Sequence, residues 1–374
     1  MTAPTCTEAG YTTYTCTCGD TYTADEVPAT GHSYVDGVCQ ICGAQEPITV
    51  VIPSTQVTGV TLAFEEEILY NIYFTVDDLS SVVEMGLITF NEKLTDGTVE
   101  NAVDVIPGYE VVGSEIRVHT NGIPAKNMGD ALYFRVYALL ADGTYAYGDV
   151  LGYNAVLYAN SILANSQSVE MKALVVALLN YGAEAQLYFG YNTDSLMNAG
   201  LTDEHQSLVT PYDESLIADV VSADGAKTVN FPVTDGFSAM ESAINFEGAF
   251  SINYYFTPTY DVEGGMILYW WDAETYDSVD VLTKENAAGS MVMTSGTEYW
   301  GAVADIAAKE IDQTVYVSGV YTSGGVEYTT GILAYSLGQY CKTKAADSAS
   351  EMQAFAAATG VYGYSAKQYF ASIA

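Results

Sequence analysis

Two hydrophobic periodicities alternate along the chain. From residue 62 to residue 74, apolar side chains occupy the even positions apart from Glu66, so they would face one way on a pleated strand. From residue 169 to residue 189 they recur every three or four positions, which is the stripe of an amphipathic helix. The pattern therefore predicts a β unit that is followed by helices.

Further strands and turns complete this β unit. Strands are predicted over residues 87–90, 115–119 and 132–137, with turns at 95–97, 107–108, 121–122 and 142–143. Helices are predicted over 154–163 and 169–189, the second with Ser168 as its N-cap. Gly182 inside the second helix costs about 1 kcal/mol relative to alanine, which predicts close packing of that helix against the sheet.

Similar stretches of sequence occur a second time further along the chain. Residues 64–74 recur as 246–256, at an offset of 182 (246 minus 64), and residues 123–126 recur as 306–309. Tyr181-Gly182 recurs as Tyr362-Gly363. Three blocks in one order at nearly one spacing indicate tandem duplication of a domain-sized unit. In the second copy we expect strands through Phe256, over 266–271 and over 314–320, and helices near 333–344 and 351–370.

These patterns predict a mainly β protein with helices, of the α+β class. A small Cys-rich N-terminal knob precedes two tandem homologous β-sandwich-like modules, each ending in two helices. The expected boundaries are 1–46 for the knob, 47–60 for a linker, 61–191 for the first module, 192–240 for a linker or edge segment, and 241–374 for the second module.

The charge of the chain restricts its partners. Its 47 acidic and 11 basic residues give a formal charge of −36, which repels nucleic acid and anionic lipid. Cations and neutral glycans are compatible with such a surface, although acidity can also serve only solubility. No apolar stretch reaches the length of a membrane span and no basic apolar leader opens the chain, so we expect neither membrane insertion nor a signal peptide in this chain.

Five of the six cysteines lie within the first 42 residues, together with His32; they are Cys6, Cys16, Cys18, Cys39 and Cys42. The pairs Cys16-x-Cys18 and Cys39-x-x-Cys42 are each followed by glycine, as in zinc knuckles. The preferred interpretation is one structural zinc held by Cys16, Cys18, Cys39 and Cys42. A second set takes Cys18, His32, Cys39 and Cys42, which leaves Cys6 to pair with Cys16. The alternative without metal is a knob stapled by disulfides such as Cys16–Cys39 or Cys18–Cys42.

The order of these motifs is also informative. Cys6-Thr7-Glu8-Ala9-Gly10 is followed by Tyr14-x-Cys16, Cys18-Gly19, Gly31-His32 and the closing segment 39–43. This order resembles a cysteine-rich, zinc-ribbon-like repeat of surface proteins from anaerobic Gram-positive gut bacteria. The run over 178–194 is likewise similar to modules of large clostridial surface proteins. The resemblance implies export and display at the cell surface, and it brings no catalytic residues.

Candidate chemistry outside the knob is sparse. His119, His205 and Cys341 are isolated from other catalytic side chains, and we expect structural roles for them. Trp270, Trp271 and Trp300 are candidate sugar platforms, but the first two are adjacent on a predicted strand, so one of them should lie in the core. Calcium is an alternative cation, with Asp77-Asp78 or residues 272–274 as ligands.

We therefore expect a non-enzymatic extracellular or cell-surface protein with a structural or adhesive role, self-assembling through its tandem units as a homo-oligomer or filament. The alternative is a glycan-binding accessory module of a secreted enzyme system. A third class is a carboxylate-dependent glycoside hydrolase, with candidates in residues 65–67 and 272–280. Such an enzyme needs two carboxyl groups that face each other across a cleft.

Overall fold

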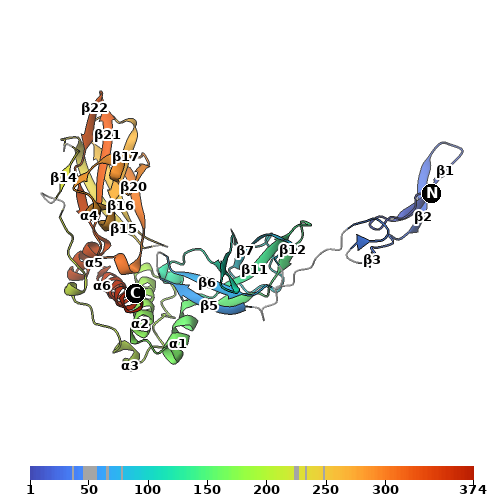
Figure 1. The fold of residues 1–374 in the computed structure, drawn as a ribbon, viewed down its shortest axis with the longest axis horizontal. Coiled ribbons are helices and arrows are strands. Elements are labelled where there is room, and N and C mark those ends of the chain that lie inside the picture. The colour runs from blue at the N-terminus through green and yellow to red at the C-terminus, as the bar shows by residue number, and fades with distance from the viewer. Residues whose placement is uncertain are drawn as a thin grey trace.

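The computed structural model describes residues 1–35, 38–44, 57–64, 67–76, 79–222, 227–231, 234–246 and 249–374. It confirms the predicted fold class, with a Cys-rich knob and two β-sandwich modules that end in helices (Figure 1). The knob consists of a hairpin of β1 (Gly10–Thr15) with β2 (Thr21–Val27), followed by the short pair β3 (Tyr34–Val35) and β4 (Val38–Cys39).

The first module is a sandwich of two antiparallel sheets. Their strand orders are β5-β6-β10-β9 and β12-β11-β7-β8, and β13 also pairs with β11. The strands are β5 (Val57–Ala63), β6 (Leu69–Phe74), β7 (Val82–Phe90), β8 (Asp104–Pro107), β9 (Glu110–Val112), β10 (Glu115–His119), β11 (Leu132–Leu140), β12 (Tyr145–Tyr147) and β13 (Leu151–Tyr153). Tyr70, Ile72 and Phe74 of β6 are buried at alternate positions, as the period-2 pattern predicts. This strand order is that of immunoglobulin-like sandwiches.

The second module repeats the strand order of the first, except that its described residues include no counterpart of β9. Its sheets run β15-β16-β20 and β19-β17-β21-β22, with β23 also on β21. The strands are β15 (Phe237–Asn245), β16 (Phe250–Pro258), β17 (Glu263–Trp271), β19 (Gly289–Val292), β20 (Tyr299–Ile306), β21 (Val315–Ser323), β22 (Val326–Thr329) and β23 (Leu333–Tyr335). A parallel pair of β14 (Thr228–Val229) and β18 (Val281–Leu282) lies beside them. The duplicated sequence thus folds twice into one topology.

Three predicted boundaries differ from the observed elements. β5 begins at Val57 and β15 at Phe237, so each first strand starts inside a segment predicted as linker. Residues 333–335 form β23 rather than the first helical turn, because they pair with β21 and Ser336 then caps the helix by accepting a hydrogen bond from the Gln339 N–H. The predicted linker 192–240 also contains the short helix α3 (Asp203–Gln206) and the 3-10 turn η3 (Glu214–Leu216).

The helices of the two modules pack against each other. α1 (Ala155–Asn165) and α2 (Val169–Phe189) end the first module, and α5 (Leu337–Ala346) and α6 (Gln353–Ile373) end the second. Tyr181 of α2 and Tyr362 of α6, which are equivalent in the two copies, stack with ring centroids 5.2 Å apart and planes 10° apart. Both are 1% exposed, and the buried residues around them form one hydrophobic cluster that includes both modules.

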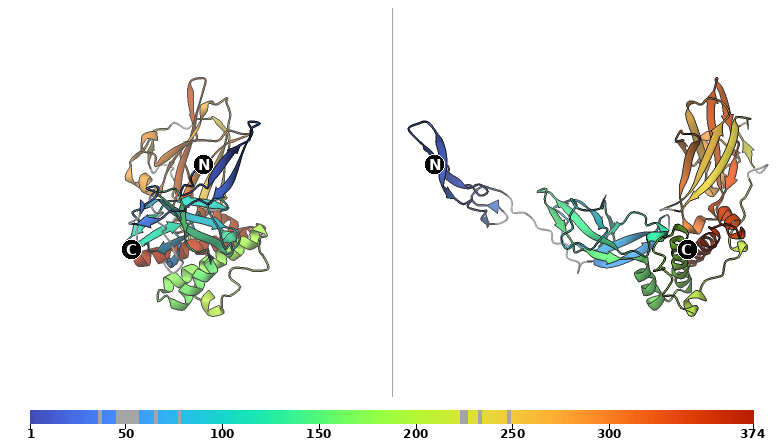
Figure 2. Two further views of the ribbon diagram at one scale, coloured as in Figure 1. Left: turned by 90° about the vertical axis from the view of Figure 1, so that its right-hand side faces the viewer. Right: turned by 180° about the vertical axis from the view of Figure 1, so that it is seen from behind.

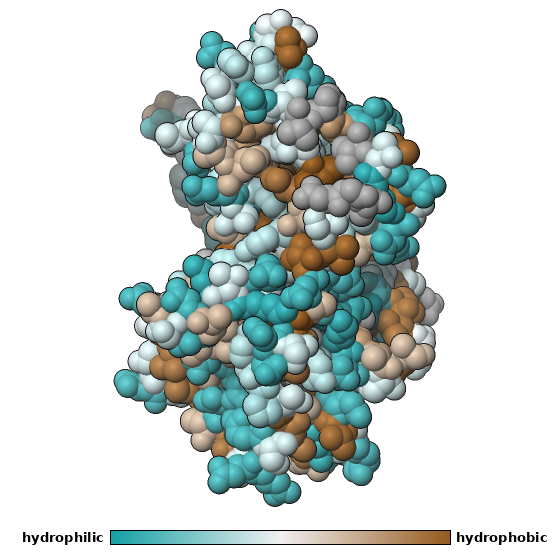
Figure 3. Space-filling view, turned by 90° about the vertical axis from the view of Figure 1, so that its left-hand side faces the viewer, coloured by the Kyte–Doolittle hydropathy of each residue, from teal (hydrophilic) through white to brown (hydrophobic). Residues whose placement is uncertain are grey.

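This shared core determines the shape of the two-module body. Figures 1 and 2 show the helices gathered at a corner from which the two sandwiches extend in different directions. On the face in Figure 3, which shows the second module and the helices, apolar side chains appear as separate patches among polar ones. The predicted N-cap of α2 is confirmed, since the Ser168 hydroxyl accepts a hydrogen bond from the Met171 N–H at 3.0 Å.

The recurrent glycines of α2 and α6 mark close approaches, but to turns rather than to a sheet face. A Cβ on Gly363 would lie 2.1 Å from Ile311 Cδ1 and 2.9 Å from the carbonyl oxygen of Ala308, in the turn η5 (Ala308–Glu310). A Cβ on Gly182 would meet the flexible Met197 side chain, 2.3 Å from its sulfur.

We expect Gly363→Ala to destabilise the protein by about 1–3 kcal/mol through overpacking, although helix propensity alone favours alanine. Gly182→Ala should cost less, because a thioether side chain can move aside. Denaturant unfolding measures both variants, and a stabilised Gly363→Ala protein would contradict the close approach.

Candidate metal centre

The β1–β2 hairpin separates the N-terminal cysteines into two groups. Its register runs from Gly10 opposite Val27 at the base to Thr15 opposite Thr21 at the tip. Cys16 and Cys18 therefore lie in the turn at the tip. At the base, the Gly31 N–H donates to the carbonyl of Cys6 at 3.1 Å, which holds the segment before His32 against the Cys6 loop.

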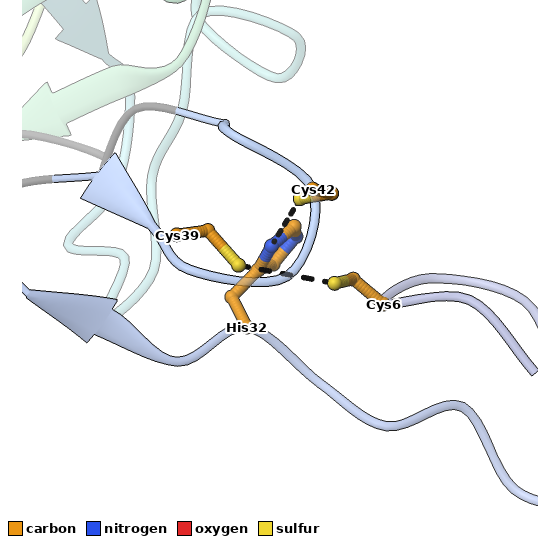
Figure 4. Close-up of side chains that lie close together, drawn as sticks. All are labelled: Cys6, His32, Cys39 and Cys42. Carbon is orange, nitrogen blue, oxygen red and sulfur yellow. Dashed lines mark hydrogen bonds between the residues drawn. The ribbon is translucent and has the colours of Figure 1, made fainter.

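Four side chains converge at the base of the knob. Cys6, His32, Cys39 and Cys42 each offer one ligand atom, and these atoms all lie within 4.8 Å of one another (Figure 4). The sulfurs of Cys6 and Cys39 are 3.8 Å apart, and Cys42 Sγ is 3.4 Å from His32 Nδ1. Tetrahedral zinc with Zn–S bonds of about 2.3 Å and Zn–N bonds of about 2.0–2.1 Å places its ligand atoms about 3.5–3.8 Å apart. The spacing fits one zinc ion, and it is too long for a disulfide of about 2.05 Å.

The Cys39–Cys42 turn has the backbone of a zinc knuckle. Gly43 has φ +74° and donates its N–H to the Cys39 carbonyl at 2.9 Å. Burial acts to raise the pKa of Cys39, but backbone N–H donors from Cys42 and Ile41 and the His32 side chain outweigh it and lower that pKa to about 5. Burial and the neighbouring thiols Cys42 and Cys39 raise the pKa of Cys6 to about 11. A divalent cation favours the thiolate form of every sulfur in the group.

The cluster takes the place of a hydrophobic core in the knob. Among the residues described from Met1 to Ala44, only Cys6, Gly10 and Cys39 are buried. Four protein ligands also fill the tetrahedron, whereas a catalytic zinc keeps a position for water or substrate. A metal ion held by all four residues would therefore have no open position for water or substrate.

The preferred ligand set from the sequence is corrected by this geometry. Cys16 and Cys18 are joined to each other as a disulfide in the hairpin turn, and they do not lie with Cys39 and Cys42. Five steps of about 3.4 Å along β1 separate the tip from the base by roughly 17 Å, so the tip cannot reach the cluster. The second set named three of the four clustered residues, but its Cys6–Cys16 pair is not formed.

Cys6 is one of the six candidate ligands from the sequence but belongs to neither of the two named sets, although the sequence does contain a signal for its place in the cluster. Tyr and Thr are concentrated on both sides of Gly19-Asp20, and two such β-prone runs around a Gly-Asp turn are typical of a hairpin. That hairpin places Cys16 and Cys18 in its turn and brings Cys6 near His32. The disulfides Cys16–Cys39 and Cys18–Cys42 are likewise absent from the described residues, since Cys39 and Cys42 are free thiols.

The three tryptophans have different environments. Trp271 is fully buried and donates its indole N–H to Asn286 Oδ1 at 3.0 Å, so one of the adjacent pair lies in the core as predicted. Trp270 is half-buried and lies over Gly289. Trp300 is 41% exposed and lies opposite Tyr255 of β16, so it has the most accessible ring of the three.

Other candidate residues have structural contacts. Cys341 is buried, and burial raises its pKa to about 12. His205 takes part in the capping box of α3, and His119 Nδ1 lies 3.0 Å from the carbonyl oxygen of Thr120. Asp272 caps α4 (Ala273–Ser278) by accepting a hydrogen bond from the Thr275 N–H at 2.7 Å. Glu65, Glu66, Asp77 and Asp78 lie outside the described residues.

A cavity of about 640 Å³ at one end of the first sandwich was not predicted from the sequence. Its walls come from positions as distant in sequence as Tyr70, Asp130 and Tyr191. No single local motif contains more than one of these three residues, so the sequence alone does not bring them together.

No protein-family model matches the chain, and no curated protein sequence does. Among solved structures, the Br derivative of BhCBM56 is 15% identical over 27% of this chain and 98% of its own, with a TM-score of 0.19. The FN1–FN3 domains of chicken CNTN1 are 6% identical over 88% of this chain and 77% of their own, also with a TM-score of 0.19. Likenesses at these scores identify neither fold nor function. No helix among the described residues is long and apolar enough to cross a membrane.

Proposed function

We propose that this chain is a non-enzymatic module of an extracellular surface protein with a structural or adhesive role. The observation that carries the proposal is the stacking of α2 on α6 at the centre of one hydrophobic cluster. Two sandwiches that share a core cannot rotate freely, so the pair is a rigid, bent spacer. A spacer benefits from duplication of a whole domain, whereas a single active site does not require it.

The location follows from independent features of the chain. Its charge of −36 disfavours nucleic acid and anionic lipid as partners. Its N-terminal motif resembles repeats of clostridial surface proteins, and a zinc-held knob is a means of ordering a short segment that has little hydrophobic core. Electron microscopy of the full chain tests the spacer role. We expect one fixed angle between the two sandwiches, and a continuous range of angles would contradict it.

Self-association has a candidate surface in the first module. β8 and β9 are the outer strands of their sheets, and Val105 and Val111 on them are exposed. An exposed apolar edge strand can pair with a strand of another chain.

We expect light scattering to show dimers or larger species as concentration rises, and Val105→Lys/Val111→Lys to remain monomeric because charge blocks edge pairing. The matched control is Val83→Lys, an exposed valine on the inner strand β7, which should associate like the unmodified chain. A chain that is monomeric at every concentration would remove self-assembly from the proposal.

Glycan binding as an accessory module is the second candidate. The specific observation in its favour is the cavity in the first sandwich, which combines aromatic rings with carboxylate and amide groups. Exposed Trp300 is a second aromatic surface, on the other module.

A further inference from the structure

The cavity lies at the end of the first sandwich where β7 ends and β8 and β11 begin. Its volume of about 640 Å³ falls within the roughly 300–1,000 Å³ of small-molecule sites. Its lining includes Tyr70, Thr89, Asp104, Asp130, Tyr133 and Tyr191. Among the described residues, the lining contains no Lys or Arg, so the cavity is unsuited to phosphate or carboxylate ligands.

The polar groups of the cavity are held in place by their own hydrogen bonds. Asp130 accepts from Asn127 Nδ2 at 3.0 Å, from the Tyr191 hydroxyl at 2.6 Å and from Asn192 Nδ2 at 2.8 Å. Tyr191 reaches Asp130 because α2 ends at Gly190, whose φ of 63° turns the chain back. Asp104 accepts from the Thr89 hydroxyl at 3.1 Å.

Tyr70 belongs to the lining, but its hydroxyl group is covered by protein. Tyr70 is 1% exposed, and its buried hydroxyl makes no hydrogen bond to the residues that the structure describes. Burial raises the pKa of Tyr70, and the nearby backbone N–H of Ala155 acts to lower it. A covered hydroxyl group does not reach a ligand, so the polar contacts that the cavity offers come from its carboxylates, amides and Thr89.

The second module shows that the fold does not require these polar groups. Thr89 pairs with Asp104 between β7 and β8, and the equivalent pair between β17 and β19 is Trp270 with Gly289. A Cβ on Gly289 would lie 2.1 Å from Trp270 Cζ2, so the indole covers the position that Asp104 holds in the first module. By the repeat offsets, Ile252 and Gln313 stand at the positions of Tyr70 and Asp130.

We propose that this cavity of the first module binds a neutral sugar residue, with Asp104 and Asp130 accepting hydrogen bonds from its hydroxyl groups. Tyr133 and Tyr191 offer ring faces to the C–H groups of the sugar. This assignment names a ligand class for the adhesive role, and therefore rests on the proposed function.

The test uses the full chain and a panel of probes, the methyl glycosides of glucose, galactose, mannose, xylose and N-acetylglucosamine and their neutral oligosaccharides. Saturation-transfer NMR and calorimetry should find at least one that binds at a ratio of one per chain. Thr89→Trp/Asp104→Gly copies the covered arrangement of the second module and should weaken binding by about tenfold or more. Tyr133→Ala should weaken it several-fold, because it removes an aromatic ring that lines the cavity.

The matched control is Tyr260→Ala, at an exposed tyrosine of the second module, which should leave affinity unchanged. Trp300→Ala tests the alternative aromatic surface on that module. Three results would overturn the site: no probe binding at millimolar concentrations, binding that survives both cavity variants, or binding that Trp300→Ala abolishes. Release of new reducing ends from a bound oligosaccharide would instead contradict the non-enzymatic function, while the site itself would stand. The fixed angle between the two sandwiches, which electron microscopy measures, depends neither on sugar binding nor on hydrolysis. The spacer role can therefore hold when the sugar site fails.

Discussion

Protein purified without added metal should contain about one zinc ion per chain. The ion is expected at Cys6, His32, Cys39 and Cys42, whose ligand atoms all lie within 4.8 Å of one another. Zinc binding in small zinc domains contributes about 10–16 kcal/mol at neutral pH, which is also their folding free energy. Chelation should therefore unfold the knob completely and leave both sandwiches folded. Elemental analysis gives the stoichiometry, and hydrogen exchange resolved along the chain gives the extent of unfolding.

Paired substitutions locate the ion. Cys39→Ser should abolish binding and unfold the knob, because Cys39 is a buried member of the cluster. Cys16→Ser/Cys18→Ser is the matched control, which should keep the zinc because both residues lie at the hairpin tip. Loss of zinc from the double variant would restore the ligand set first inferred from the sequence. A Cys6–Cys39 disulfide in the protein without zinc would favour a stapled knob.

Local patterns in the sequence predicted the strands, the helices and the fold class, because these features depend on residues that are close together in the chain. The period-2 run around Tyr70 and the helical stripe of α2 gave the elements and their class, and the repeat gave two copies of one topology. The rule that adjacent strand residues face opposite sides placed one of Trp270 and Trp271 in the core, and Trp271 is buried there.

What could not be predicted depends on residues far apart in sequence. The zinc ligands were assigned by spacing, whereas the register of one hairpin decides which cysteines meet. The apolar stripe of α2 shows that this helix is buried but does not name α6 as its partner. Likewise, the cavity gathers Tyr70, Asp104, Asp130 and Tyr191 from four segments. The pairing of α2 with α6 and the assembly of the cavity are fixed by tertiary contacts, which no local pattern encodes, whereas the hairpin that separates the cysteines has a local signal in the sequence.

Tyr362→Ala should destabilise both modules at once, by about 3–5 kcal/mol. Tyr362 is 1% exposed and stacks on Tyr181 of the other module, so its loss leaves a cavity in the core that the two copies share. Because that core is continuous, denaturant should unfold the sandwiches in one transition, which the variant shifts as a whole.

Tyr362→Phe is the matched control for this variant. It keeps the ring and removes a hydroxyl that has no hydrogen-bond partner among the described residues, so we expect it to leave stability unchanged or slightly raised. A cycle with Tyr181→Ala should give a coupling of about 0.5–1.5 kcal/mol between the two rings. Hydrogen exchange followed separately in each sandwich shows whether Tyr362→Ala destabilises one module or both. If Tyr362→Ala weakened only the second module, the two sandwiches would be independent beads and the rigid spacer would fail.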